Sequence, residues 1–250
     1  MNPKPTIEEL AITLSAKNLN PTLLTPEFLV YSGIIPSDWT LASQPILNSQ
    51  IAHLAFTNGI NLSTQFDTIT ISENLKNKTP QQIQIPEIAR KYTSTLPNAN
   101  YQAISINPST FFTFESEAES AAQNYISTYL LAPGPWQQIG TNPLRASVHL
   151  AYTLERSQFN LKIDDVLLRQ ADDTPQAALL FSGSFPYKIA GETPQEKLHL
   201  IHQLIDNWQT DLEIFREVVW QKFLSFPTVE KEVLSHSENE FNWQMADNNN

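Results

Sequence analysis

Three side chains near the carboxyl end of the chain have the types and spacing of a metal site. His199 and His202 are three residues apart, and Asp206 follows His202 by four, so all three lie on one flank of a helix. Two imidazoles and a carboxylate can bind a transition metal such as zinc, manganese or iron. The alternative is structural: both histidines border the apolar side of the helix and His202 pairs with Asp206. The motif His-Glu-x-x-His is absent, which favours this alternative.

Two further polar motifs bear on hydrolytic chemistry. The Ser-Gly-Ser sequence at 182–184 follows an apolar run but lacks the flanking glycines of the nucleophile turn in serine hydrolases. We therefore expect a bulge or turn at a strand end there. Asp164 and Asp165 are adjacent in a predicted strand, so their side chains point to opposite faces and cannot form one acid–base pair. The inward carboxylate is expected to find a partner such as Arg169.

Aromatic residues in two polar contexts point to protein binding. Trp136 lies in the loop Pro-Gly-Pro-Trp at 133–136, and Phe241 and Trp243 lie in an acidic tail. Tryptophan is a favoured anchor of protein interfaces, and an acidic segment with two aromatic residues can dock as a short linear motif. The alternatives are a loop tryptophan folded over the core and tail aromatics that rest on the domain.

Composition narrows the functional classes. The chain has 250 residues, a net charge of −11 and no cysteine, so disulfides, thiolate nucleophiles and cysteine-based metal sites are excluded. The acidic charge disfavours nucleic acid and anionic membranes as partners. We see neither the apolar segment of a signal peptide nor a run long enough to span a membrane. These features predict a soluble, cytoplasmic protein.

The first half of the chain is predicted to alternate short strands with helices. Asn58-Gly59 provides the two residues with positive φ that a tight hairpin turn requires. Thr25-Pro26 and Pro86 are predicted helix starts. The predicted strands lie near 9–16, 51–56, 60–66, 69–71 and 101–106.

The second half is predicted to hold three strands and the longest helix. The strands lie near 146–155, 158–168 and 177–189, and Thr193-Pro194 with Glu196 forms a capping box. A helix over 194–224 would be about 45 Å long. Its apolar seam consists of Leu198, Ile201, Ile205, Trp208, Leu212, Phe215 and Val219. This seam is predicted to cover the sheet, and the alternative is a coiled coil between two copies.

These elements predict the α+β class, with mainly antiparallel sheet covered by helices. Each half reads as three strands followed by a helix, which allows a duplicated β-meander-plus-helix unit. We expect one domain over 1–234, with halves near 1–132 and 136–234 separated at Pro133. Residues 235–250 are expected to be a disordered acidic tail.

Several segments resemble a family of conserved hypothetical proteins from cyanobacteria. They are the segments 23–29, 32–39, 56–59, 85–89 and 131–136, with the sequences LLTPEFL, SGIIPSDW, FTNG, IPEIA and LAPGPW. The arrangement is also similar to a sporadically distributed bacterial family of unknown function. The resemblance implies a bacterial, intracellular protein, and it transfers no catalytic residue.

The sequence does not fix a function. Our first hypothesis is a non-catalytic protein-binding or adaptor protein that uses Trp136, Phe241 and Trp243, with no cofactor. The second is a metal-dependent or hydrolytic enzyme acting on a small molecule, through His199, His202 and Asp206. The third is a structural homodimer formed through the long helix.

Overall fold

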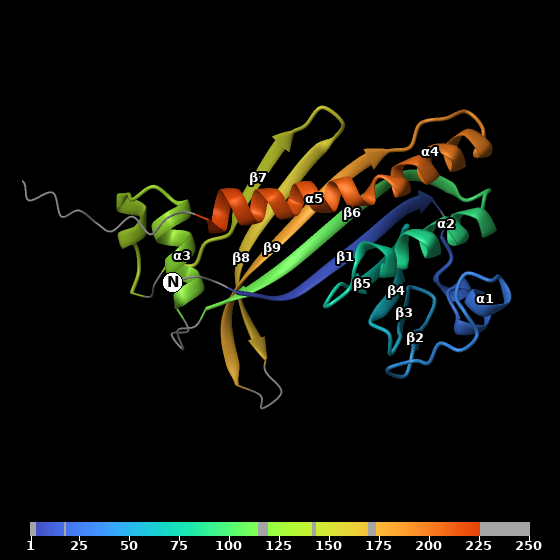
Figure 1. The fold of residues 1–250 in the computed structure, drawn as a ribbon, viewed down its shortest axis with the longest axis horizontal. Helices are drawn as coiled ribbons and strands as arrows, with labels where there is room; N and C mark the ends of the chain where they lie inside the picture. The colour runs from blue at the N-terminus through green and yellow to red at the C-terminus, as the bar shows by residue number, and fades with distance from the viewer. Residues whose placement is uncertain (1–3, 18, 115–119, 142–143, 170–173, 226–250) are drawn as a thin grey trace, which may run out of the picture.

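A single antiparallel sheet runs through the protein (Figure 1). The computed structural model describes residues 4–17, 19–114, 120–141, 144–169 and 174–225. The sheet has nine strands in the order β2-β3-β4-β5-β1-β6-β9-β8-β7. They are β1 (Lys4–Lys17), β2 (Ile46–Leu47), β3 (Ile51–Ala55), β4 (Ile60–Gln65), β5 (Thr68–Asn74), β6 (Asn100–Thr113), β7 (Val148–Thr153), β8 (Gln158–Arg169) and β9 (Pro175–Lys188).

Helical segments connect the strands and confirm the α+β class. The α-helices are α1 (Pro26–Tyr31), α2 (Ile85–Thr95), α3 (Ala121–Tyr125), α4 (Pro194–Asp206) and α5 (Trp208–Glu217). Shorter turns are the 3-10 segments η1 (Pro21–Leu23), η2 (Pro80–Gln82) and η4 (Pro135–Gln138), and the π-helical segments η3 (Ile126–Leu130) and η5 (Val218–Leu224). Among the described residues, no helix has both the length and the apolar character needed to cross a membrane.

The two halves of the sheet repeat one topology. From the centre outward, the first half runs β1-β5-β4-β3 and the second runs β6-β9-β8-β7. The halves meet where β1 and β6 pair antiparallel, with Ile12 opposite Ile106. Each unit therefore has a leading strand in addition to its meander, because a helical segment separates that strand from the other three. The repeat divides the chain between α2 and β6 rather than at Pro133, and both units share one sheet.

The leading strand of the second half is longer than its sequence suggests. The strand was predicted near 101–106, yet β6 continues through Pro108 to Thr113. Pro108 keeps its place opposite Leu10 of β1, while the pairing with β9 resumes only at Ser109. A proline has no backbone N–H to donate, so the ladder toward β9 is interrupted at this position and the strand itself is not.

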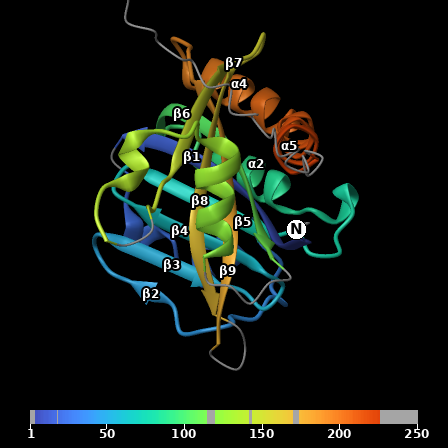
Figure 2. The ribbon, with the colours of Figure 1, turned by 90° about the vertical axis from the view of Figure 1, so that its left-hand side faces the viewer.

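Helices cover one face of the sheet, which we call the covered face. Alternate strand residues such as Leu10, Ile12 and Leu14 are fully buried there, as the two-residue period of a strand requires. Contacts join α2 to β1 and β5, α4 and α5 to β6, and α3 to β9. Figures 1 and 2 show α2, α4 and α5 on the same side, with the strands of the first half crosswise to β8 and β9. The opposite side is the open face.

The predicted C-terminal helix is confirmed over 194–224, with an interruption at Asn207 between α4 and α5. Thr193 and Glu196 form the predicted capping box. The seam residues from Ile201 to Val219 are buried in the protein's own core, so they cover the sheet. A Cβ on Gly183 would lie 2.7 Å from the Phe215 ring. The Ser-Gly-Ser motif is thus the middle of β9, where glycine lets α5 approach, and not a turn.

Candidate functional site

The predicted metal ligands do not converge. Asp206 forms an ion pair with Arg90 of α2, and His199 Nε2 lies 2.9 Å from Gln203 Nε2. His202 Nε2 lies 3.1 Å from Thr93 Oγ1. Within the described part of the chain, no group of three or more His, Cys, Asp or Glu side chains could hold a metal ion. The flank instead joins α4 to α2.

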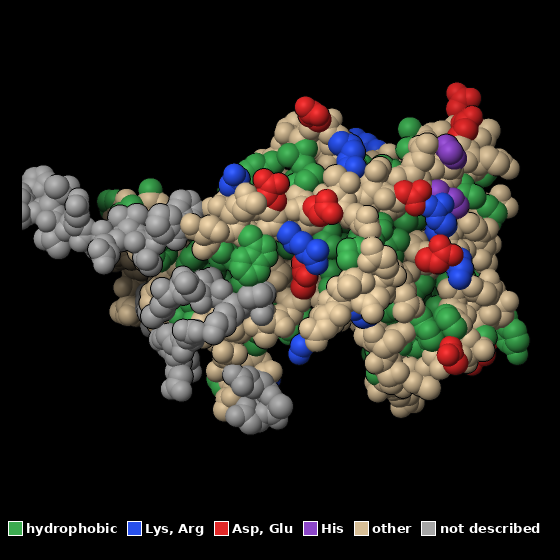
Figure 3. Space-filling model, viewed as in Figure 1, with side chains coloured by type: hydrophobic (Ala, Val, Ile, Leu, Met, Phe, Trp, Pro, Cys, Tyr) green, Lys and Arg blue, Asp and Glu red, His purple; other side chains and the backbone are tan. Residues whose placement is uncertain are grey.

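This contact between helices changes the titration of one histidine. Burial lowers the pKa of His202 below its ordinary value of 6.5, and the nearby positive charge of Arg90 lowers it further. The neutral imidazole is therefore favoured in the folded protein. Figure 3 shows the histidines beside both basic and acidic side chains on the helix side of the molecule.

The adjacent aspartates of β8 have separate partners, as their alternation requires. Asp165 accepts hydrogen bonds from Arg145 Nε and Nη2 at 3.0 and 2.7 Å. Asp164 accepts one from Ser147 Oγ at 2.6 Å and lies 3.0 Å from Lys162 Nζ. The Asp165 carboxylate therefore pairs with Arg145 rather than Arg169, because the segment leading into β7 passes beside β8, and it also accepts a hydrogen bond from Gln123 Nε2 at 3.4 Å.

A chain of side-chain hydrogen bonds crosses the centre of the open face. Thr70 bonds Thr13 at 3.1 Å, and the Asn107 amide donates to Thr13 at 3.1 Å. Ser105 donates to Asn107 at 2.7 Å and bonds Ser184 at 3.0 Å. These five residues link β5, β1, β6 and β9 across the junction of the two halves. The Ser105–Ser184 bond joins β6 to β9 beside the gap in their backbone ladder, so the arrangement is structural.

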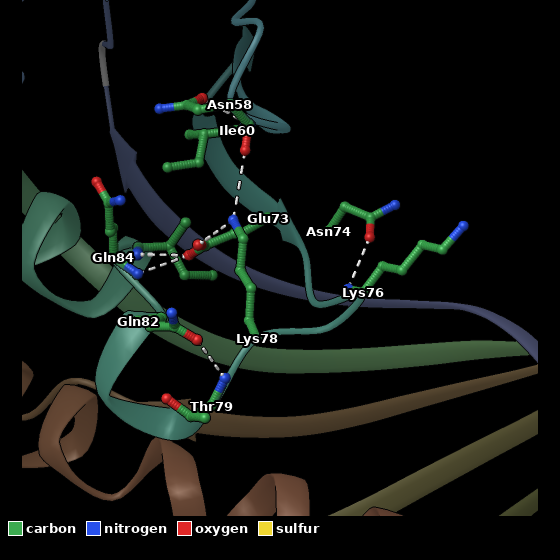
Figure 4. Close-up of polar contacts among 10 residues, drawn as sticks. Asn58, Ile60, Glu73, Asn74, Lys76, Lys78, Thr79, Gln82 and Gln84 are labelled. Atoms are coloured by element: carbon green, nitrogen blue, oxygen red, sulfur yellow. Dashed lines mark hydrogen bonds and ion pairs between the residues drawn. The ribbon is translucent and has the colours of Figure 1, made fainter.

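Among the residues that the structure describes, each half buries one carboxylate completely, and the first is Glu73 on β5. Its oxygens accept hydrogen bonds from the backbone N–H of Gln84 at 2.7 Å and of Ile85 at 3.1 Å, and from Lys78 Nζ at 2.7 Å (Figure 4). The free N–H groups at the start of a helix favour a negative charge. Glu73 therefore fixes the start of α2 against the sheet.

The second buried carboxylate is Asp211 on α5. Tyr187 Oη donates to its two oxygens at 2.9 and 2.8 Å, and Arg156 forms an ion pair with it. Burial raises the pKa of Asp211, although the bonds from Tyr187 and Arg156 oppose this rise. The carboxylate is closed off from solvent, so it anchors α5 to β9 and to the β7–β8 turn.

A pocket of about 260 Å³ lies at the end of α2, and its lining holds no charged side chain. The lining residues are Leu19, Asn20, Leu23, Tyr92, Thr95, Leu96, Pro97, Asn98 and Ala99. Burial raises the pKa of Tyr92 to about 12, so this hydroxyl stays protonated. The pocket thus offers shape and hydrogen bonds but no general acid or base that works near neutral pH.

The remaining candidate is a group of exposed apolar side chains, which we call the aromatic end: Tyr129, Trp136 and Ile139. Their exposed fractions are 59%, 43% and 79%. The indole of Trp136 lies against Gly134. A Cβ on Gly134 would be 2.2 Å from the indole Nε1.

Specific bonds hold the aromatic end in place. Gln137 Nε2 donates to the Ser127 carbonyl at 3.1 Å, which joins η4 to η3. Tyr125 Oη donates to the carbonyl of Phe223, and its ring lies 5.5 Å from that of Tyr129. Trp136 was a predicted contact residue, whereas Tyr129 and Ile139 were not predicted. The uncharged run 120–141 was the signal that would have revealed them.

Phe241 and Trp243 lie outside the described residues, as does the tail 235–250. Comparison with known proteins adds no assignment: no family model matches the chain, and a search of curated proteins gives no match. The cyanobacterial resemblance remains a prediction.

Proposed function

We propose that this chain is a non-catalytic protein-binding protein that contacts its partner through the aromatic end. The observation that carries the proposal is the exposure of Tyr129, Trp136 and Ile139 on one anchored segment. Large apolar side chains held in a fixed position lose little conformational entropy on binding and are favoured interface anchors.

The charge pattern supports the same surface. Residues 120–141 contain no Asp, Glu, Lys, Arg or His, in a chain where 16% of residues are charged. The centres of protein interfaces are depleted in charge because ions are costly to dehydrate. An uncharged patch on an acidic protein therefore suits a partner that covers it completely.

The tail residues Phe241 and Trp243 are proposed as a second contact. The described chain ends at Ser225, and Phe223 is bonded to Tyr125 at the base of the aromatic end. Ser225, the last described residue, follows Phe223 by two positions. One partner could contact both regions.

The test is affinity capture with variants that separate binding from folding. Tyr129→Ala with Trp136→Ala should reduce capture of a specific protein by about tenfold or more, since interface aromatics contribute roughly 1–2 kcal/mol each. Gly134→Ala should also reduce it, because the added Cβ displaces the indole while every aromatic residue remains. A chain ending at Ser235 tests Phe241 and Trp243.

Tyr31→Ala is the matched control, because Tyr31 is 90% exposed and lies in the first half. It should leave capture unchanged, and none of the variants should lower the melting temperature by more than a few degrees. Equal capture by wild type and the double variant would contradict the proposal. A large fall in melting temperature of the double variant would instead assign the rings to the core.

A further inference from the structure

The two edges of the sheet differ in how well they are protected. At one edge, β2 has only two residues, Ile46 and Leu47. At the other, β7 has six residues from Val148 to Thr153, all paired with β8 on one side, and no described strand pairs with the other side. Short edge strands are a common protection against pairing with other chains. The β7 edge lacks this protection, and Figure 1 shows β7 and β8 projecting beyond α5.

The hydrogen-bond pattern identifies the free backbone groups of β7. The N–H of Leu154 donates to the Ser157 carbonyl at 2.8 Å, so these two residues form a hydrogen-bonded pair at the turn. Such pairs alternate along an antiparallel ladder. Leu150 and Tyr152 therefore bond toward β8. His149, Ala151 and Thr153 direct their N–H and C=O groups outward.

The side chains of β7 suit burial at an interface. The strand Val-His-Leu-Ala-Tyr-Thr has no acidic residue, lysine, arginine or proline. Tyr152 begins a stack of rings that extends inward, 5.7 Å from Phe159, which lies 4.6 Å from Phe185. The outermost ring is 37% exposed, so the stack ends at the edge with one side free.

We propose that β7 pairs antiparallel with β7 of a second copy, about a twofold axis at Ala151. Outward-facing residues must pair with outward-facing residues, so Ala151 lies opposite its own copy and His149 lies opposite Thr153. In this register Leu150 lies opposite Tyr152, on the covered face, twice in the dimer. The pairing joins the two sheets into one.

The strand's own composition favours a second copy as the occupant. A chain with a net charge of −11 repels its copies in general, but this register brings no like charges into opposition. An aliphatic side chain opposite an aromatic one stabilises a strand pair, and twofold symmetry supplies that pair twice. The small side chain at the axis avoids a clash. The β7 edge is separate from the aromatic end, so this inference does not depend on the proposed function.

Sedimentation equilibrium of the full chain tests the pairing. Samples from about 1 μM to about 1 mM cover the dissociation constants expected of a small interface, and the wild type should form dimers within this range. Ala151→Lys places two positive charges opposite each other and should weaken dimerisation by about tenfold or more. Leu47→Lys adds the same charge at the other edge and should leave the dimer intact.

A mixture of two variants tests the register itself. Ala151→Glu alone should dimerise as weakly as Ala151→Lys, and an equal mixture of the two should form a heterodimer more tightly than either variant pairs with itself, because opposite charges then meet at the axis. A wild type that stays monomeric at every concentration would overturn the proposal. A dimer that Ala151→Lys leaves unchanged, or a mixture that stays monomeric, would overturn it as well.

Discussion

The two halves of the sheet share a strand order but satisfy their buried carboxylates in different ways. Glu73 in the first half binds backbone N–H groups and a lysine that follow it within twelve residues. Asp211 in the second half depends on Arg156 and Tyr187, which precede it by 55 and 24 residues. The first carboxylate closes a local connection, and the second holds a helix to distant strands.

The two carboxylates therefore stabilise the same strand order in two different ways. Glu73 accepts hydrogen bonds from N–H groups at the start of α2, which would otherwise be buried without a partner. Its negative charge therefore stabilises the start of this helix. Asp211 is fully buried and its oxygens contact Tyr187 and Arg156, and burial raises its pKa. Burial therefore disfavours the ionised form of Asp211, while its bonds with Tyr187 and Arg156 favour that form.

The largest effect is expected from Glu73→Ala. It leaves two N–H groups of the α2 start and the Lys78 ammonium without their acceptor, which should cost about 3 kcal/mol of unfolding free energy. Urea denaturation measures this loss. Glu87→Ala is the control, because Glu87 is an exposed residue of the same helix that lies 3.7 Å from Lys91. A loss below about 1 kcal/mol for Glu73→Ala would remove the contrast between the halves.

A smaller effect is expected from Asp211→Asn, about 1 kcal/mol near neutral pH, because the amide oxygen can still accept from Tyr187. The raised pKa means that the protonated carboxyl favours folding. That contribution is complete below the ordinary value of 3.8 and is lost as the pH rises through the folded value. The advantage of the wild type over Asp211→Asn should therefore be larger near pH 4 than near pH 7 in calorimetric melting. An advantage that grows with pH would contradict this assignment.

The smallest effect is expected at His202, where α4 meets α2. Its lowered pKa means that the folded protein binds fewer protons than the unfolded chain. The resulting stability is complete above pH 6.5 and is lost as the pH falls below it. His202→Gln should flatten the fall in melting temperature below that pH, while His199→Gln on the same flank should not. Equal profiles for the two variants would show that the contact between the helices does not depend on His202.

Much of the fold could be predicted from local patterns. The Thr193 capping box and the apolar seam of the last helix act within a few residues, and the structure has both. The hairpin between β3 and β4 is also present, but only Gly59 of the predicted pair has positive φ, and the loop closes through a hydrogen bond from the Phe56 N–H to the Ile60 carbonyl. The strand near 101–106 was predicted too short, because the effect of the missing N–H of Pro108 depends on which neighbouring strand needs it. The repeat boundary was also misplaced, because the pairing of β1 with β5 and of β6 with β9 spans helices and loops.

The candidate site also has features that the sequence predicted and features that it did not. The residue types at 199, 202 and 206 allowed a metal site, but Arg90 and Thr93 of another helix engage two of these side chains instead. Trp136 was recognisable from its rigid loop. Tyr129 and Ile139 join the same candidate surface only because η3 packs against η4 in the folded chain.

By itself, the sequence determined the α+β class, the helix starts, the tight hairpin and the apolar faces, because caps, turns and periodicity are short-range properties of the chain. Only the tertiary structure decided that both halves share one sheet, and that β7 forms its longer unpaired edge. It also decided which partners the charged side chains of the helices and of β8 receive. These outcomes depend on contacts between residues far apart in the chain, which no local pattern specifies.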